Sequence, residues 1–268
     1  MNVVINGVSY YVEQYGTGFP LVLLHGFTGD TSTWTPFCDI WEMHSHIIIP
    51  DIIGHGKTES PQDVNHYKIE AAARDLASIL DHLGINQIDL LGYSMGGRLA
   101  LTFAMLYPER VRKLILESAS PGLLTEEERK LRCMNDAKLA NFIIEKGIVA
   151  FVDYWEEIPL FASMRELPAE VRIKIREQRL RNSPIGLSNS LLGMGTGSQP
   201  SWWEGLHTLT CDVLMVTGEY DQKFRRIAEN MAKLIKNSSL VTIANCGHTI
   251  HVEDNEKFGT IVSDFLSN

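Results

Sequence analysis

The sequence predicts an α/β fold, in which a mostly parallel central sheet has helices on both faces and a helical cap is inserted into the core. Three observations support this prediction. Apolar runs that suit strands buried on both faces alternate with segments of helical periodicity. A Gly-x-Ser-x-Gly motif lies between one of these runs and a helical segment. The chain from about residue 125 to 203 is charged, helical in pattern and poor in strand-like runs.

The first part of the chain supplies the early strands. Residues 8–15 alternate between apolar and polar side chains as a strand with one covered face does. Continuous apolar runs at 20–24 and 46–50 suit strands of a parallel sheet that is covered on both sides. Residues 68–83 have helical periodicity, which stops at Gly84. These segments predict the first strands of the sheet and one of its covering helices.

The serine motif and the later runs complete the sheet. A short apolar run at 88–91 precedes the motif, and residues 99–104 continue from it as a helix. The remaining segments are three expected strands and a last helix, at 111–116, 212–218, 240–243 and about 252–266. The pattern divides the chain into a core of residues 1–122 and 206–268 and a helical cap of residues 123–205. Ligands in such folds bind at the carboxyl ends of the strands, and a cap would close over that edge.

Composition excludes several classes of protein. The chain has 268 residues, of which 44% are hydrophobic and 21% charged, and this is typical of a soluble globular domain. A net charge of −9 and the lack of a long basic stripe disfavour nucleic-acid binding. No signal-peptide pattern and no apolar run of the roughly 18 residues that a membrane span needs are present. We therefore expect a cytoplasmic enzyme with no membrane partner, while the oligomeric state leaves no signal in the sequence.

The four cysteines are scattered and form no Cys-x-x-Cys pair, so we expect free thiols and no metal site. They stand at Cys38, Cys133, Cys211 and Cys246.

The motif at residues 92–98 reads Gly-Tyr-Ser-Met-Gly-Gly-Arg and predicts a nucleophile elbow with Ser94 at its tip. A serine between a strand and a helix occupies a strained turn, and flanking glycines let the backbone crowd itself there. The helix that begins behind the serine adds positive potential where an oxyanion would form.

A nucleophilic serine needs a base and an orienting carboxylate, which follow it in the order Ser, Asp or Glu, His in enzymes with this elbow. Asp221 follows the expected strand at 212–218, and His248 follows the one at 240–243. Both therefore lie at the edge of the sheet where the elbow points, and we assign them as carboxylate and base. Glu219 is the alternative carboxylate and His251 the alternative base. Five other histidines are interpreted as solvated or core side chains: His44, His46, His66, His82 and His207.

An oxyanion hole is expected from two backbone N–H groups. His25-Gly26-Phe27 follows the strand at 20–24, and the N–H of Phe27 can pair with that of Met95, which follows the serine. His25 is expected to brace this loop.

Arg98 stands one helical turn after Ser94 among apolar neighbours. A buried guanidinium without a partner is costly, so it must pair either with a carboxylate of a ligand or with one of the protein, such as Glu117. The ligand interpretation gains from the further arginines in the expected cap.

Four segments together resemble the 2-succinyl-6-hydroxy-2,4-cyclohexadiene-1-carboxylate synthases of menaquinone biosynthesis, which have the α/β-hydrolase fold. They are the elbow at 92–98, Glu-Ser-Ala-Ser-Pro-Gly-Leu at 117–123, Gly-Glu-Tyr-Asp-Gln-Lys-Phe at 218–224 and Gly-His-Thr-Ile-His at 247–251. The resemblance implies a lyase without a cofactor, which eliminates pyruvate from 2-succinyl-5-enolpyruvyl-6-hydroxy-3-cyclohexene-1-carboxylate. It implies a triad, three arginines on the substrate carboxylates and aromatic side chains in the pocket: Ser94, Asp221 and His248; Arg98, Arg132 and Arg181; Tyr93 and either Tyr154 or Trp155.

A substrate with three carboxylates would explain arginines around a serine site in a chain of net charge −9. We expect Ser94, activated by His248, to remove a ring proton without forming an acyl-enzyme. The alternative is a carboxylesterase or carbon–carbon bond hydrolase that uses the same triad through an acyl-enzyme. Arg98 discriminates between them, because a neutral ester needs no cation there. A non-catalytic receptor on this scaffold is disfavoured because no member of the triad is missing.

Overall fold

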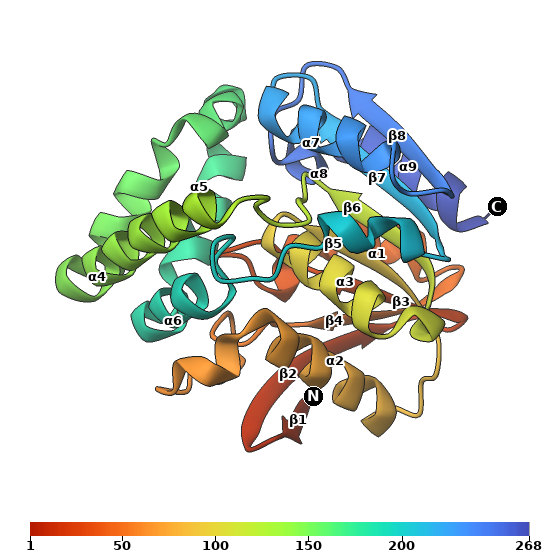
Figure 1. Cartoon of the computed structure of the whole chain (residues 1–268), viewed down its shortest axis with the longest axis horizontal. Coiled ribbons are helices and arrows are strands. Elements are labelled where there is room, and N and C mark those ends of the chain that lie inside the picture. The colour runs from red at the N-terminus through yellow and green to blue at the C-terminus, as the bar shows by residue number, and fades with distance from the viewer. Residues whose placement is uncertain (268) are drawn as a thin grey trace.

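A mostly parallel sheet of eight strands forms the centre of the chain in the computed structural model, which describes residues 1–267 (Figure 1). The strand order is β1-β2-β4-β3-β5-β6-β7-β8. β2 pairs antiparallel with both of its neighbours, β1 and β4, and the strands from β4 to β8 in this order all pair parallel. The strands are β1 (Asn2–Ile5), β2 (Val8–Tyr15), β3 (Phe19–Leu24), β4 (Ser45–Pro50), β5 (Ile88–Tyr93), β6 (Val111–Glu117), β7 (Asp212–Gly218) and β8 (Ser238–Ile243). The expected mostly parallel sheet is confirmed.

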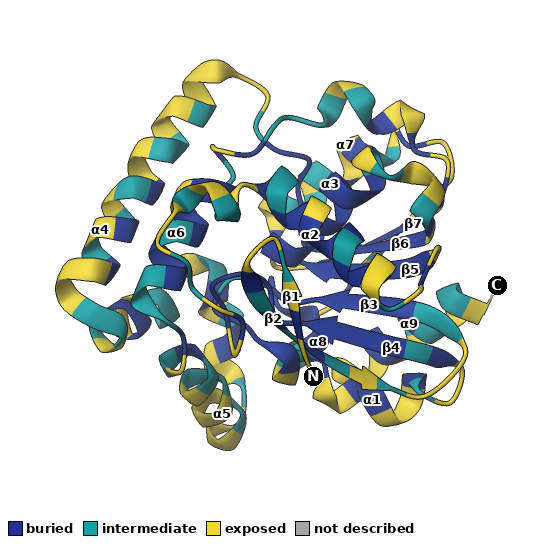
Figure 2. Cartoon of the chain, turned by 90° about the horizontal axis from the view of Figure 1, so that it is seen from below, coloured by how far each residue is buried: buried dark blue, intermediate teal, exposed yellow. Residues whose placement is uncertain are grey.

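Helices cover both faces of this sheet (Figure 2). Apolar side chains of α2 (Ile69–His82), α3 (Met95–Leu106) and α7 (Gln222–Ala232) pack in the larger core cluster. Those of α1 (Thr35–Trp41) and α9 (Asn255–Ser267) pack in a second cluster on the opposite face. The short α8 (Ile250–Glu253) directly precedes α9.

The register of the parallel strands brings their carboxyl ends to one edge. Leu24 at the end of β3 pairs with Gly92 in β5, and Tyr93 at the end of β5 pairs with Glu117 at the end of β6. Glu117 in turn pairs with Val216 in β7. The loops that follow these strands are therefore neighbours, although they come from distant parts of the sequence.

The segment between β6 and β7, which we expected to be the cap, lies beside the sheet and contains no strand among its described residues (Figure 1). Its helices are α4 (Glu126–Glu156), α5 (Ala169–Leu180) and α6 (Pro184–Met194). Thr125 and Glu128 form a capping box at the start of α4, and α4 is kinked at Gly147, where φ is 79°. An apolar cluster that includes Ile143, Phe151 and Leu187 holds α4 against α6.

No helix within residues 1–267 is both long enough and apolar enough to cross a membrane.

Candidate active site

Ser94 lies between β5 and α3 with φ of 51° and ψ of −105°, a backbone conformation that L-residues rarely adopt. The turn is possible because glycines stand at the positions where backbone segments approach each other most closely. A Cβ on Gly96 would overlap the carbonyl oxygens of Leu24 and His25, and one on Gly92 would overlap that of Gly96. The strained turn therefore presents the Ser94 side chain at the carboxyl edge of the sheet.

The structure brings Ser94, His248 and Asp221 together. His248 Nε2 lies 3.0 Å from Ser94 Oγ, and His248 Nδ1 lies 2.6 Å from Asp221 Oδ2. Asp221 also caps α7, since its Oδ1 accepts the N–H of Phe224 at 3.3 Å. These distances place a base on the serine and an orienting carboxylate on the base, which is the geometry of a Ser-His-Asp triad.

The two alternatives lie elsewhere. Glu219 Oε2 accepts the N–H of Asn245 at 2.9 Å, so this carboxylate closes the loop after β8. His251 lies in α8, where its Nδ1 is 2.9 Å from the buried carboxylate of Glu117. Neither contacts Ser94 through a hydrogen bond within residues 1–267, and the geometry favours Asp221 and His248.

The N–H groups of Phe27 and Met95 are free to bind an anion. Both residues line the cavity at Ser94, and neither N–H donates a hydrogen bond within residues 1–267. His25 braces the loop before Phe27: its Nε2 accepts the N–H of Ile52 at 3.0 Å, and its Nδ1 lies 2.8 Å from Gly26 O. Burial lowers the pKa of His25, so the imidazole is neutral and donates through Nδ1.

A cavity of about 550 Å³ opens over Ser94 and His248 between the core and the cap, and we call it the triad cavity. Aromatic side chains of its wall pack against the His248 imidazole. The Phe224 ring lies 4.6 Å from the ring of His248, centroid to centroid, and the Phe161 ring from the cap lies 6.2 Å from it.

Arg98 and Arg132 both line the triad cavity. Arg98 Nη1 donates to Met194 O and to Gln199 Oε1, each at 2.5 Å, and Arg132 Nε donates to Asp136 at 2.8 Å. Burial and then the charge of Arg132 lower the pKa of Arg98 to about 9, so its guanidinium remains charged at neutral pH. Glu117 is not its partner, and the protein offers Arg98 neutral oxygens as direct hydrogen-bond partners. Among the described residues, the field of Asp136 is what offsets the cost of burying the charge of Arg98.

Tyr93 and Trp155 are in the wall of the triad cavity, whereas Tyr154 is 52% exposed and does not line it. The Tyr93 hydroxyl lies 3.0 Å from Thr249 Oγ1, and burial raises the pKa of Tyr93. The ring of Trp155 stands edge-on to Phe27, 5.4 Å between centroids. Of the two cap aromatics expected from sequence, the structure brings only Trp155 to the site.

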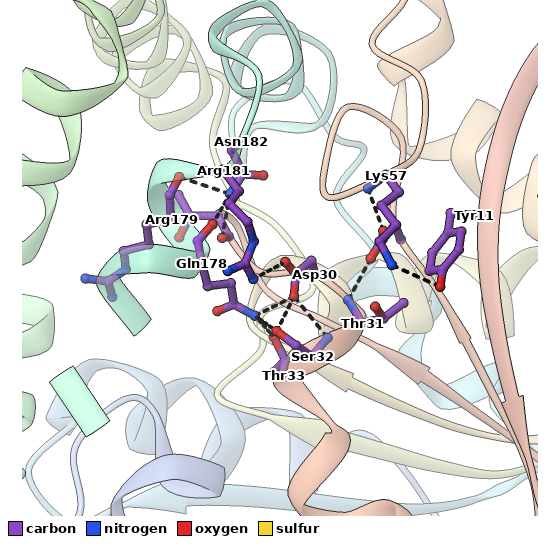
Figure 3. A network of polar contacts seen from close by, with 12 residues as sticks. Tyr11, Asp30, Thr31, Ser32, Thr33, Lys57, Gln178, Arg179, Arg181 and Asn182 are labelled. Carbon is purple, nitrogen blue, oxygen red and sulfur yellow. Dashed lines mark hydrogen bonds and ion pairs between the residues drawn. The ribbon is translucent and has the colours of Figure 1, made fainter. Parts of the chain in front are cut away.

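Arg181 is not in the triad cavity, and this expectation needs correction. Its Nη2 forms an ion pair with Asp30 Oδ2 at 3.0 Å, within a surface network that also contains Gln178 and Ser32 (Figure 3). Arg181 follows the last residue of α5 and stands two positions after Arg179. Residues two apart on a helix point to nearly opposite sides. The side chain therefore turns toward the loop after β3 and away from the triad.

Arg179 is a buried cation that the sequence reasoning did not single out. It is 6% exposed, its Nη1 lies 3.5 Å from Glu156 Oε1, and its guanidinium lies 5.0 Å from the centroid of Phe161. In Figure 3 its side chain extends away from the Asp30 network. It lines a second cavity of about 410 Å³ that shares the side chains of Tyr93 and Phe161 with the triad cavity. The signal was available in the helical periodicity of residues 169–180, which puts Arg179 and Arg181 on different faces.

Comparisons with known proteins give the family of the chain. The family model for the alpha/beta hydrolase fold matches residues 20–255. A protein of Bacillus subtilis (strain 168), provisionally named 2-succinyl-6-hydroxy-2,4-cyclohexadiene-1-carboxylate synthase, is 48% identical over 99% of this chain and 97% of its own. The synthase of that name from Photorhabdus laumondii is 30% identical over 92% of this chain and 85% of its own. The structure of MenH from S. aureus superposes with a TM-score of 0.92 at 39% identity, covering 96% of this chain and 97% of that one.

Proposed function

We propose a function from one premise, that this chain belongs to the α/β-hydrolase family and, within it, to the 2-succinyl-6-hydroxy-2,4-cyclohexadiene-1-carboxylate synthases. The chain is a pyruvate-eliminating lyase of menaquinone biosynthesis. It converts 2-succinyl-5-enolpyruvyl-6-hydroxy-3-cyclohexene-1-carboxylate into 2-succinyl-6-hydroxy-2,4-cyclohexadiene-1-carboxylate. The reaction needs no cofactor, because a base and an oxyanion hole suffice for a proton abstraction followed by elimination.

One observation carries this proposal beyond the fold. The triad cavity places Ser94 and His248 within one enclosure with two arginines, of which Arg98 has only neutral oxygens as hydrogen-bond partners. A substrate with several carboxylates matches these charges, whereas a neutral ester would leave Arg98 without an anion. Because the net charge of the chain is −9, the positive charge in this cavity is a local feature that the overall composition does not explain.

The proposed reaction begins at Ser94. His248 takes the hydroxyl proton, and the serine oxygen removes the ring proton α to the succinyl ketone. The electron pair of the broken C–H bond moves to the ketone oxygen, and the N–H groups of Phe27 and Met95 hold the resulting enolate. Re-formation of the ketone then moves electrons through the ring and breaks the bond to the enolpyruvyl oxygen. The released enolpyruvate takes the proton that His248 holds and becomes pyruvate, so the imidazole is neutral again and no bond to Ser94 forms.

Arg98 and Arg132 hold substrate carboxylates in this proposal. Arg179 replaces Arg181 as the third arginine, because Arg179 is buried beside the shared wall of Tyr93 and Phe161 and Arg181 is committed to Asp30. The apolar faces of Trp155 and Phe27 cover the ring of the substrate.

The test is pyruvate release from the enolpyruvyl substrate by the wild type, Ser94→Ala and Arg98→Ala, with a neutral aryl ester assayed beside it. The proposal predicts rapid pyruvate release that both substitutions suppress, and slow ester cleavage. Rapid ester cleavage that is indifferent to Arg98, without pyruvate release, would return the chain to the esterases.

A further inference from the structure

Lys223 is a third cation in the wall of the triad cavity, and no carboxylate within residues 1–267 forms an ion pair with it. Among the residues that line this cavity, the cations are Arg98, Arg132 and Lys223, and the acid is Glu128. The Glu128 carboxylate is occupied in the capping box, where it accepts the N–H of Thr125 at 3.0 Å. Lys223 forms no hydrogen bond or ion pair in the described part of the chain, and its nearest described partner is the neighbouring Phe224 ring at 5.4 Å.

The position of Lys223 is unfavourable for a cation in the empty protein. It is the second residue of α7, so it stands at the positive end of the helix dipole. Lys223 is exposed at the edge of the cavity, where local desolvation and then the charge of Arg132 lower its pKa, while Asp221 opposes this shift. An anion bound there would remove both penalties at once, because it would pair with Lys223 and with the N-terminus of α7 together.

The same position places Lys223 close to the chemistry. Asp221 of the triad precedes it by two residues, and Phe224, which follows it, packs 4.6 Å from the His248 ring. The two arginines stand on other elements, Arg98 on α3 and Arg132 on α4. The cations therefore reach the cavity from three separate elements.

We propose that Lys223 binds a carboxylate of the substrate beside the catalytic histidine, together with Arg132, and thereby selects polycarboxylate substrates over neutral ones. This inference rests on the proposed function for the identity of the substrate. It adds a specificity residue that neither the triad nor the arginine pair contains. In this proposal the Lys223 ammonium donates a charge-assisted hydrogen bond to a carboxylate of the substrate.

The first part of the test compares Lys223→Met with Lys223→Arg in pyruvate release. Loss of one charge-assisted contact predicts a KM raised about 10- to 100-fold in Lys223→Met, with kcat changed less than about threefold. Lys223→Arg restores KM to within about threefold of the wild type, because the charge is retained. Arg226→Met is the control, because it removes an exposed positive charge from α7 that does not line the cavity, and it leaves KM unchanged.

The second part is a pH profile, which a merely structural role would not move. The charged and titratable groups that face Lys223 are Arg132 and Glu128 on α4, Arg98 on α3, and Asp221 and His248 of the triad. Loss of the ammonium proton as the pH rises weakens binding, so kcat/KM of the wild type declines at alkaline pH. Arg98, whose pKa is about 9, contributes to this decline in every variant. The part that is due to Lys223 moves to higher pH in Lys223→Arg, because an exposed guanidinium keeps its charge where an ammonium loses it.

Separate outcomes distinguish the two proposals. Wild-type protein that releases no pyruvate refutes the proposed function, whatever Lys223 does. Wild-type protein that releases pyruvate, with a KM in Lys223→Met equal to that in Arg226→Met, refutes the role of Lys223 alone. The rate at which a neutral fluorophosphonate labels Ser94 reports the triad, and we expect it to be the same in both variants and the wild type. A slower rate in Lys223→Met would assign the residue to support of the triad and contradict carboxylate binding.

Discussion

Glu117 receives two hydrogen bonds from His251, one from its backbone N–H at 3.0 Å and one from Nδ1 at 2.9 Å. The carboxylate is fully buried at the end of β6, and the His251 ring packs edge-on against Tyr93 at 4.6 Å between centroids. The chain thus has a second histidine–carboxylate pair, which packs against Tyr93, the residue before Ser94. This pairing occupies both Glu117, the protein carboxylate considered for Arg98, and His251, the alternative base.

Glu117→Ala is expected to destabilise the fold. The substitution leaves the buried N–H and Nδ1 of His251 without an acceptor, and two such losses lower the free energy of unfolding by about 3 kcal/mol. Urea unfolding of purified protein measures the loss, with Glu117→Gln as the control that keeps one acceptor and loses less. A decrease below about 1 kcal/mol in Glu117→Ala would show that the pair adds little to stability.

Asp221→Asn is expected to lower kcat by about 10³- to 10⁴-fold with little change in KM, because an amide favours the wrong tautomer of His248. Glu219→Gln is the matched control on the same loop, since its carboxylate binds the N–H of Asn245 and not the histidine. Steady-state pyruvate release measures both. A larger loss in Glu219→Gln than in Asp221→Asn would reverse the assignment of the orienting carboxylate.

Arg179 and Arg181 make a matched pair two residues apart in the cap. Arg179→Met should raise KM by about 10-fold or more, because it removes a buried cation at the wall beside Tyr93. Arg181→Met should leave KM within about threefold, because it breaks only an exposed ion pair to Asp30. Equal KM effects in the two variants would mean that the cap rearranges on binding and that Arg181 reaches the substrate.

The stability of the protein is expected to fall below pH 6.5. Burial lowers the pKa of His55 to about 3, and its Nε2 has no hydrogen-bond partner among the described residues. The imidazole of the unfolded chain protonates near pH 6.5, so below that pH the unfolded state binds the additional proton. The free energy of unfolding then falls by up to about 1.4 kcal/mol per pH unit from this histidine alone, until about pH 3.

Urea unfolding at pH 7.5, 6.5 and 5.5 measures this slope in the wild type and in His55→Gln. The variant should lose less stability between pH 6.5 and 5.5, whatever its stability at pH 7.5. His44→Gln is the control, because His44 is exposed, and it should keep the wild-type slope. Equal slopes for all three proteins would contradict the buried, neutral state of His55.

The fold and the proximity of Ser94, Asp221 and His248 could be predicted because their signals are local. The strained turn at Ser94 requires glycines at fixed spacing, and the strand before it requires an apolar run. Asp221 and His248 lie in the loops that come after β7 and β8, and parallel strands end at a common edge. Each of these inferences needed only a pattern of a few residues and the rule that joins them.

The cap could not be predicted to the same depth, because its side chains depend on helix rotation. Successive residues of a helix are rotated by about 100°. The sequence therefore indicated Arg181, which is exposed, whereas Arg179, two residues earlier, is the buried arginine. Tyr154 and Trp155 are adjacent in sequence, and only packing against Phe27 and Phe161 shows that Trp155 faces inward. Lys223 lies in the segment 218–224 that carries the family resemblance, but its chemistry left no signal there, because a lysine in the first turn of a surface helix has the pattern of a solvated residue.

The central claim is that Ser94 removes a proton and forms no bond with the substrate. Rapid quenching during turnover of the enolpyruvyl substrate, followed by intact-protein mass spectrometry, tests it most directly. The account predicts that pyruvate accumulates over many turnovers while the protein keeps its unmodified mass at every time point. A stoichiometric adduct that appears before steady state, maps to Ser94 and is absent from Ser94→Ala would contradict it and establish covalent catalysis.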